Sequence, residues 1–195
     1  MDQFLFHREF PIEESFFFVS SLTARSDNRF GREEDHLVNA WNESIRDYDY
    51  ISMLTRKKYP ADVTLTTRCS FDAFGAPLIV ITDDYRTDES GHNFYGLHFE
   101  VVAYENGINI WHIVPAPAGS ERPIKVTKIA FGEFPVPEKT PLELAVTIRG
   151  KSITACLNGN TVSAEHPDLP AEFHAGITAC EGINRFYSFG VEENA

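Results

Sequence analysis

The feature that most restricts the fold of this chain is the Asn106-Gly107 dipeptide, which lies between two β-prone runs in Phe94–Val114 (FYGLHFEVVAYENGINIWHIV). Asn-Gly favours a two-residue type I′ turn, because both central residues of that turn have positive φ. Such a turn joins two antiparallel strands and fixes their register. With Asn106-Gly107 as the two turn residues, Val102 lies opposite Trp111. We call this predicted unit the central hairpin.

The two faces of the central hairpin differ in character, because successive side chains of a strand point to opposite sides of a sheet. The polar face carries His98, Glu100, Val102, Tyr104, Asn109, Trp111 and Ile113. The apolar face carries Leu97, Phe99, Val101, Ala103, Ile108, Ile110, His112 and Val114. The apolar face is predicted to be core, with His112 as a satisfied or edge histidine. A sheet face that mixes an acid, an imidazole, an amide and large rings is typical of proteins that hold sugars.

The remainder of the chain also consists of short β-prone segments. The predicted strands beyond the hairpin lie at 36–45, 48–55, 63–71, 77–82, 124–131, 144–149, 153–157, 161–164, 174–180 and 185–192. Gly150-Lys151 fits a type II′ turn, and Asn158-Gly159 fits a second type I′ turn. Because we find no amphipathic helix of ten residues with convincing caps, the pattern predicts an all-β sandwich. At 195 residues the chain fits a single domain, residues 1–195, with residues 1–47 as an irregular N-terminal part that wraps the sandwich.

Charge and the N-terminal sequence restrict the partners and the location. The net charge of −12 argues against nucleic acid and anionic membrane as partners, since both require a positive surface. The first eighteen residues, MDQFLFHREFPIEESFFF, contain early acids and no basic region followed by a long apolar stretch. They do not look like a signal peptide or a membrane span, so we expect a cytoplasmic protein.

Four segments carry a resemblance to a known fold family: Tyr59–Phe71 (YPADVTLTTRCSF), Tyr95–Glu100 (YGLHFE), Pro141–Leu157 followed by Asn-Gly-Asn, and the ending HAGITACEGINRFYSFGVE. Their order resembles the concanavalin A-like lectin/glucanase superfamily, which includes laminin-G-like domains and several glycoside hydrolase families. The likeness covers roughly residues 50–192. It implies a two-sheet antiparallel jelly roll whose concave face takes a carbohydrate.

The sequence departs from the glucanases of that superfamily at one place. Those enzymes carry three acids at alternate positions on one strand face, whereas the matching face here shows His98, Glu100, Val102 and Tyr104. Glu100 is therefore the one acid on this face, and Glu105 points the other way. The departure argues against hydrolysis of the glucanase type with retention of configuration.

The leading hypothesis is a carbohydrate-binding protein. Trp111 and Tyr104 can stack against a pyranose ring, while their polar tips bond hydroxyl groups. Asn109, His98 and Glu100 can bond further hydroxyls. Arg68, from the strand at 63–71, can grip an acidic sugar or form an ion pair with Glu100. The competing interpretation of Trp111 is that a neighbouring loop covers it.

The alternative is a glycoside hydrolase with Glu100 as the acid or base and His98 beside it. Burial would raise the proton affinity of Glu100. Glycoside hydrolysis normally needs a second carboxylate about 5–5.5 Å away for retention, or roughly 6.5–9.5 Å away for inversion. Asp83, Asp84 and Glu181 lie in loops that can reach Glu100. A third hypothesis is a protein-interaction module without catalysis.

No cofactor is required by these hypotheses, but one acidic loop is a candidate metal site. Asp83, Asp84 and Asp88 belong to an acidic loop and can hold Ca²⁺, an ion that takes six to eight oxygen ligands. Their spacing follows no calcium-loop template, and a solvated acidic loop is the favoured interpretation. The sequence contains no nucleophile elbow, P-loop, HExxH motif or dinucleotide fingerprint.

Overall fold

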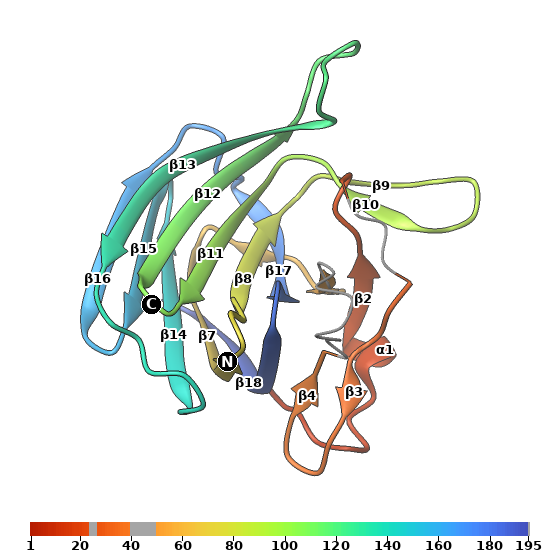
Figure 1. The fold of residues 1–195 in the computed structure, drawn as a ribbon. Coiled ribbons are helices and arrows are strands. Elements are labelled where there is room, and N and C mark those ends of the chain that lie inside the picture. The colour runs from red at the N-terminus through yellow and green to blue at the C-terminus, as the bar shows by residue number, and fades with distance from the viewer. Residues whose placement is uncertain (24–26, 40–49, 195) are drawn as a thin grey trace.

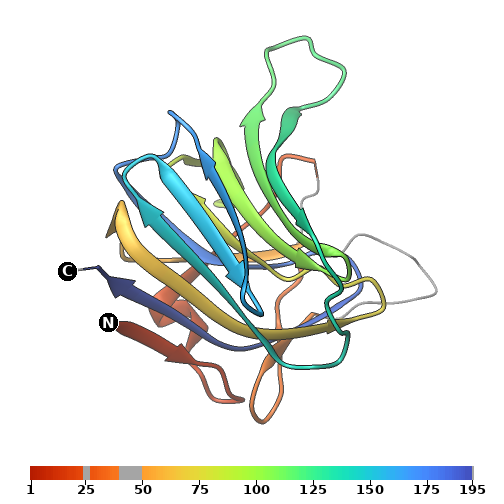
Figure 2. The same cartoon turned by 90° about the vertical axis from the view of Figure 1, so that its left-hand side faces the viewer.

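The computed structural model describes residues 1–23, 27–39 and 50–194 and is almost entirely β-structure. Two eight-stranded antiparallel sheets lie face to face as two layers (Figures 1 and 2). A single short helix, α1 (Ile12–Ser15), occurs among the described residues. No helix in these residues is long and apolar enough to cross a membrane. The prediction of a two-sheet antiparallel sandwich is confirmed.

The first sheet, which we call sheet A, contains the three consecutive strands predicted at 144–149, 153–157 and 161–164. Its strands are β1 (Asp2–Leu5), β3 (Gly31–Arg32), β4 (Leu37–Val38), β7 (Asp62–Asp72), β14 (Leu142–Arg149), β15 (Ser152–Leu157), β16 (Asn160–Glu165) and β18 (Ile183–Glu193). They are arranged in the order β16-β15-β14-β7-β18-β4-β3, and β1 pairs with β18.

The second sheet, sheet B, contains the central hairpin. Its strands are β2 (Phe16–Val19), β5 (Ile51–Thr55), β6 (Tyr59–Pro60), β8 (Leu78–Thr82), β11 (His98–Tyr104), β12 (Gly107–Pro115), β13 (Ile124–Glu133) and β17 (Glu172–Ala179). They follow the order β13-β12-β11-β8-β17-β5-β2, with β6 paired to β17. A small ribbon of β9 (Tyr85–Thr87) and β10 (Asn93–Tyr95) extends beside it (Figure 1).

The N-terminal stretch is more regular than the sequence indicated. Instead of only wrapping the sandwich, it adds β1 to β18, β4 to β18 and β2 to β5. β4 and β5 lie within the predicted strands at 36–45 and 48–55, and residues 40–45 and 48–49 of those segments lie outside the described residues.

The turn at Asn158-Gly159 is as predicted. Leu157 pairs with Asn160, so two residues form the loop. The φ angles of Asn158 and Gly159 are 52° and 82°, both positive, as a type I′ turn requires.

The turn of the central hairpin differs from the prediction by one residue. Tyr104 pairs with Gly107, so the turn residues are Glu105 and Asn106, and Gly107 begins β12 with a φ of 132°. The predicted pairing of Val102 with Trp111 is therefore wrong, and Glu100 is the partner of Trp111. This correction changes the register by two residues. Because side chains alternate with a period of two, each side chain stays on its predicted face.

Two apolar clusters follow from that alternation. The larger cluster fills the space between the sheets and includes Phe99, Val101 and Ile110 from the predicted apolar face of the hairpin. The smaller one lies on the outer face of sheet B and includes Leu78 and Val102, with Trp111 packed against it. Sheet B therefore carries apolar side chains on both faces. The long loop between β12 and β13 projects away from the sandwich (Figures 1 and 2).

Candidate functional site

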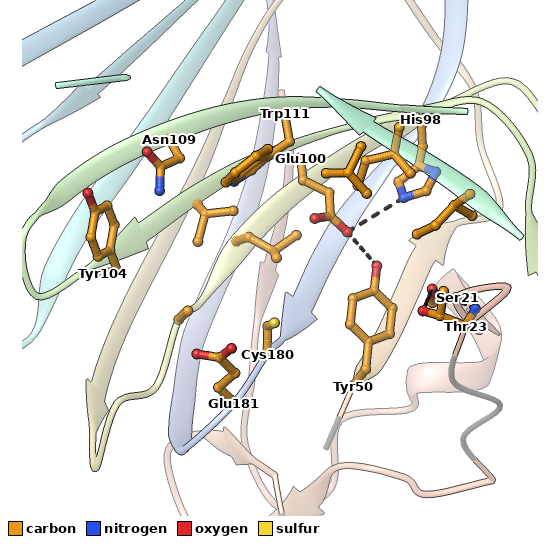
Figure 3. A pocket seen from close by; sticks show the side chains of 16 residues that line it. Ser21, Thr23, Tyr50, His98, Glu100, Tyr104, Asn109, Trp111, Cys180 and Glu181 are labelled. Atoms are coloured by element: carbon orange, nitrogen blue, oxygen red, sulfur yellow. Dashed lines mark hydrogen bonds and ion pairs between the residues drawn. The ribbon is translucent and has the colours of Figure 1, made fainter. Parts of the chain in front are cut away.

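The polar face of the central hairpin lines a pocket on the outer face of sheet B. Its volume is about 330 Å³. All seven residues predicted for this face line it: His98, Glu100, Val102, Tyr104, Asn109, Trp111 and Ile113. The other lining residues are Ser21, Thr23, Tyr50, Ala76, Leu78, Ile124, Val126, Cys180 and Glu181. Figure 3 shows Tyr104 and Asn109 at one end of the pocket and His98 at the other.

Glu100 lies at the centre of the polar lining and is only 8% exposed. Tyr50 donates its hydroxyl hydrogen to Glu100 Oε1 at 2.6 Å, and His98 Nε2 lies 3.6 Å from the same oxygen (Figure 3). A buried carboxylate is costly unless it accepts hydrogen bonds. The Tyr50 phenol therefore stabilises an acceptor on the wall of the pocket, and the His98 imidazole lies beside it.

The orientation of His98 follows from its second nitrogen. Nδ1 lies 2.9 Å from the carbonyl oxygen of Gly96, which can only accept, so Nδ1 donates a hydrogen. Nε2 is thereby turned toward Glu100. The His98 ring also stacks on Tyr95, with ring centroids 4.4 Å apart. The imidazole is thus held on two sides.

Tyr50 is a permanent hydrogen-bond donor at neutral pH. Complete burial, together with the nearby carboxylate of Glu100, raises the pKa of the Tyr50 phenol well above its usual value. Burial likewise raises the pKa of Tyr95, whose hydroxyl lies 2.5 Å from Ser52 Oγ. Both phenols therefore remain neutral hydrogen-bond donors.

Trp111 presents a partly exposed ring to the pocket between Asn109 and Glu100 (Figure 3). A β-bulge between Ile110 and Trp111 shifts the pairing with β13, so that Trp111 lies opposite Lys128. Bulges often re-aim a side chain beside a functional site. The ammonium group of Lys128 lies 4.9 Å from the centre of the indole ring, within the range of a cation–π contact. The ring lines an open pocket. The competing interpretation, in which a neighbouring loop covers Trp111, does not describe this position.

Asn109 brings a side-chain amide to the pocket. The residue is 9% exposed, and Oδ1 is buried without a hydrogen-bond partner. A buried polar atom without a partner costs about 1–3 kcal/mol. A bound molecule that donates a hydrogen would recover that cost only if the side chain turned to bring Oδ1 to the pocket.

The prediction that Arg68 shares this face is wrong. Arg68 lies on β7 in sheet A, where it alternates with the core residues Leu65 and Cys69. It is exposed on the outside of that sheet, and its guanidinium lies 5.4 Å from the ring centre of Tyr187. Polar residues of both sheets point away from the shared core. They therefore face opposite sides of the sandwich, and Arg68 cannot pair with Glu100.

The predicted calcium ligands do not form a common site. Asp84 Oδ2 accepts the backbone N–H of Leu97 at 2.8 Å. Asp88 Oδ1 accepts hydrogen bonds from the backbone of Ser90 and His92. In the part of the chain that the structure describes, Asp83, Asp84 and Asp88 are not grouped around a common point as metal ligands would be. The carboxylates of Asp84 and Asp88 stabilise loop conformation instead.

The loop acids proposed as partners of Glu100 separate into two groups. Glu181 lines the pocket, whereas Asp83 and Asp84 do not. Sequence reasoning missed Tyr50, Ser21 and Thr23 as lining residues. Tyr50 immediately precedes a predicted strand, but the sequence contains no signal that β5 lies two strands away from β8. Tertiary pairing alone brings Tyr50 to Glu100.

Comparison with known proteins gives matches in structure only. No protein-family model matches the sequence, and no curated protein matches it. Among solved structures, the carbohydrate-binding module CBM66 from Bacillus subtilis has a TM-score of 0.63 at 12% identity, covering 90% of this chain and 99% of the module. LamAcat from Zobellia galactanivorans has a TM-score of 0.61 at 8% identity, covering 99% and 97% of the two chains.

A lectin domain shows the same likeness. The exoplasmic/lumenal domain of VIP36, in a form bound to Ca²⁺ and Man3GlcNAc, has a TM-score of 0.58 at 14% identity. The match covers 98% of this chain and 88% of that domain. Identities this low establish the fold and leave the ligand open. With its two antiparallel sheets and these neighbours, the chain has the concanavalin A-like jelly-roll fold.

Proposed function

We propose that this protein binds a carbohydrate in the pocket on the outer face of sheet B. The observation that carries the proposal is the combination of a buried, tethered carboxylate, a side-chain amide and a partly exposed indole in one cavity, supplied by Glu100, Asn109 and Trp111. Sugars present hydroxyl donors beside apolar C–H patches, and this lining offers a partner for each.

In this proposal each group has a separate role. Glu100 accepts hydrogen bonds from sugar hydroxyls as a charged acceptor, and the Asn109 amide bonds a further hydroxyl. The indole of Trp111 stacks on the C–H face of a pyranose, and Tyr104 closes the end of the pocket. A volume of about 330 Å³ is at the lower end for ligand pockets, which suits a short sugar segment.

The structural neighbours support a carbohydrate as the ligand class. Their names describe a carbohydrate-binding module and a domain bound to Man3GlcNAc. The second of these is also bound to Ca²⁺. We therefore include calcium as a condition in the binding test, with titrations in Ca²⁺ and in EDTA.

Replacement of Trp111 by alanine tests the proposal. We expect the affinity for a sugar identified on a glycan array to fall at least tenfold, about 1.4 kcal/mol, because the stacking surface is lost. Isothermal titration calorimetry measures the change. Phe131→Ala is the matched control, since Phe131 is an aromatic residue on neighbouring β13 that also contacts Lys128 but does not line the pocket. Equal affinity for wild type and Trp111→Ala, or no binding to any sugar, would contradict the proposal.

A second candidate function is sugar cleavage, because Glu100 and Glu181 line the same pocket. In this scheme Glu100 acts as acid or base and Glu181 supplies the second carboxylate. The prediction is that an oligosaccharide bound by the wild type is hydrolysed, and that Glu100→Gln and Glu181→Gln each abolish hydrolysis. Binding without turnover in the wild type would exclude it.

A further inference from the structure

A second group of polar side chains lies on the other side of β12 from the sugar pocket. His112 Nε2 lies 3.1 Å from Asp168 Oδ2, and His166 Nδ1 lies 3.9 Å from the same oxygen. The two imidazole rings are in contact, with centroids 4.0 Å apart. His112 belongs to sheet B, whereas His166 and Asp168 lie in the segment that leads from β16 of sheet A into β17 of sheet B.

The spacing of these atoms matches the coordination shell of a small metal ion. One ligand atom from each of the three residues can be chosen so that all lie within 4.8 Å of one another. Zn²⁺ binds imidazole nitrogen and carboxylate oxygen at about 2.0–2.2 Å, so its tetrahedral ligands are roughly 3.3–3.5 Å apart. The observed separations of 3.1 and 3.9 Å bracket that value. Small side-chain movements would bring the three ligands to one ion.

The two nitrogen atoms are also available as electron-pair donors. His112 Nε2 is buried without a hydrogen-bond partner, although the carboxylate oxygen lies close to it. His166 Nδ1 accepts the backbone N–H of Asp168 at 3.2 Å, so this nitrogen carries a lone pair and no proton, and a metal ion would take the place of that hydrogen bond.

We propose that His112, His166 and Asp168 form a binding site for a divalent transition-metal ion, with Zn²⁺ as the best-suited ion. Two imidazoles and one carboxylate suit zinc and its neighbours in the first transition series, whereas calcium prefers a shell of oxygen atoms. A fourth position is left to water or to another small ligand.

The site is separate from the sugar pocket, and its position predicts an effect on stability. Trp111 and His112 are adjacent on β12 and point to opposite faces of sheet B. A metal ion at His112 would join β12 to the segment that connects β16 with β17. An ion that binds only the folded chain raises the unfolding temperature.

Zinc titration of metal-free protein, prepared with EDTA and without a polyhistidine tag, tests the site. We expect calorimetry to show one Zn²⁺ per chain, and a 100-fold excess over Kd to raise Tm by roughly 5–10 °C. His166→Ala and Asp168→Asn remove ligands at partly exposed positions, with side-chain exposures of 21% and 45%, so both variants are expected to fold. Each should weaken zinc binding at least tenfold and reduce the Tm rise at the same zinc concentration to about half or less.

The control is His36→Ala, which removes an imidazole that is paired with a single acid, Asp35, at 2.7 Å. This variant should bind zinc as the wild type does. Absence of saturable binding by the wild type below about 1 mM zinc, or unchanged binding in His166→Ala and Asp168→Asn, would overturn the proposal. Neither His166 nor Asp168 lines the sugar pocket, so both variants should bind sugar as the wild type does. A sugar titration of these variants therefore separates failure of the metal site from failure of the proposed function.

Discussion

Replacing Gly107 by alanine is expected to lower the free energy of unfolding by about 3–5 kcal/mol, the largest effect on stability that we predict for a single methyl group in this chain. A Cβ atom at this position would lie 1.9 Å from the carbonyl oxygen of Gly132 on the adjacent strand β13. The φ angle of 132° is also unfavourable for an L-residue. Both backbones would have to move, and the pairing of β12 with β13 would be strained. Urea denaturation followed by circular dichroism measures the change.

Gly159→Ala is the matched control for this prediction. Gly159 also lies in an Asn-Gly dipeptide at a hairpin turn and has a positive φ of 82°, but nothing lies within 4 Å of its Cβ position. Its replacement should therefore lower the free energy of unfolding only through the strain of an alanine at positive φ, by about 1–2 kcal/mol. If the two variants lost equal stability, close packing against Gly132 would not be the reason for glycine at position 107.

These two Asn-Gly dipeptides show how far a turn motif can be read from sequence. Asn158-Gly159 forms the expected type I′ turn, whereas the central hairpin turns at Glu105-Asn106. The difference arises from the third strand, because β13 approaches Gly107 so closely that only a glycine fits within β12 there. A dipeptide preference is local and contains no information about that neighbour.

The faces of the hairpin were predictable even though its pairing was not. Alternation depends only on the strand being extended, and a register change of two residues leaves Glu100 and Trp111 on one side. The alternation of side chains therefore predicted correctly which hairpin residues lie together on the face that lines the pocket.

The remaining parts of the site depend on tertiary arrangement, which alternation within one strand cannot supply. Arg68 has the expected polar, outward position on its own strand but belongs to the opposite sheet. Tyr50 reaches Glu100 although the two residues are 50 positions apart in sequence. His112 was expected to be a satisfied or edge histidine, and its two partners lie more than 50 residues further along the chain. All three positions depend on which segments become neighbours in the folded chain.

Replacing Glu100 by alanine is expected to reduce sugar affinity at least 100-fold, about 2.7 kcal/mol. The change removes the charged acceptor of the pocket and leaves the Tyr50 hydroxyl without this acceptor and His98 Nε2 facing an empty space. A hydrogen bond to a charged group contributes about 1.5–3 kcal/mol. Calorimetric titration with the sugar measures the loss, and circular dichroism verifies that the sheets persist.

Two further variants separate charge from shape. Glu100→Gln keeps an oxygen for the Tyr50 hydroxyl but loses the negative charge, so its affinity should fall between those of the wild type and Glu100→Ala. Glu105→Ala removes an exposed acid at the turn of the same hairpin, outside the pocket, and should bind as the wild type does. If Glu105→Ala weakened binding as much as Glu100→Ala, the protein's overall negative charge would be responsible. The tethered carboxylate at the centre of the pocket would then have no special role.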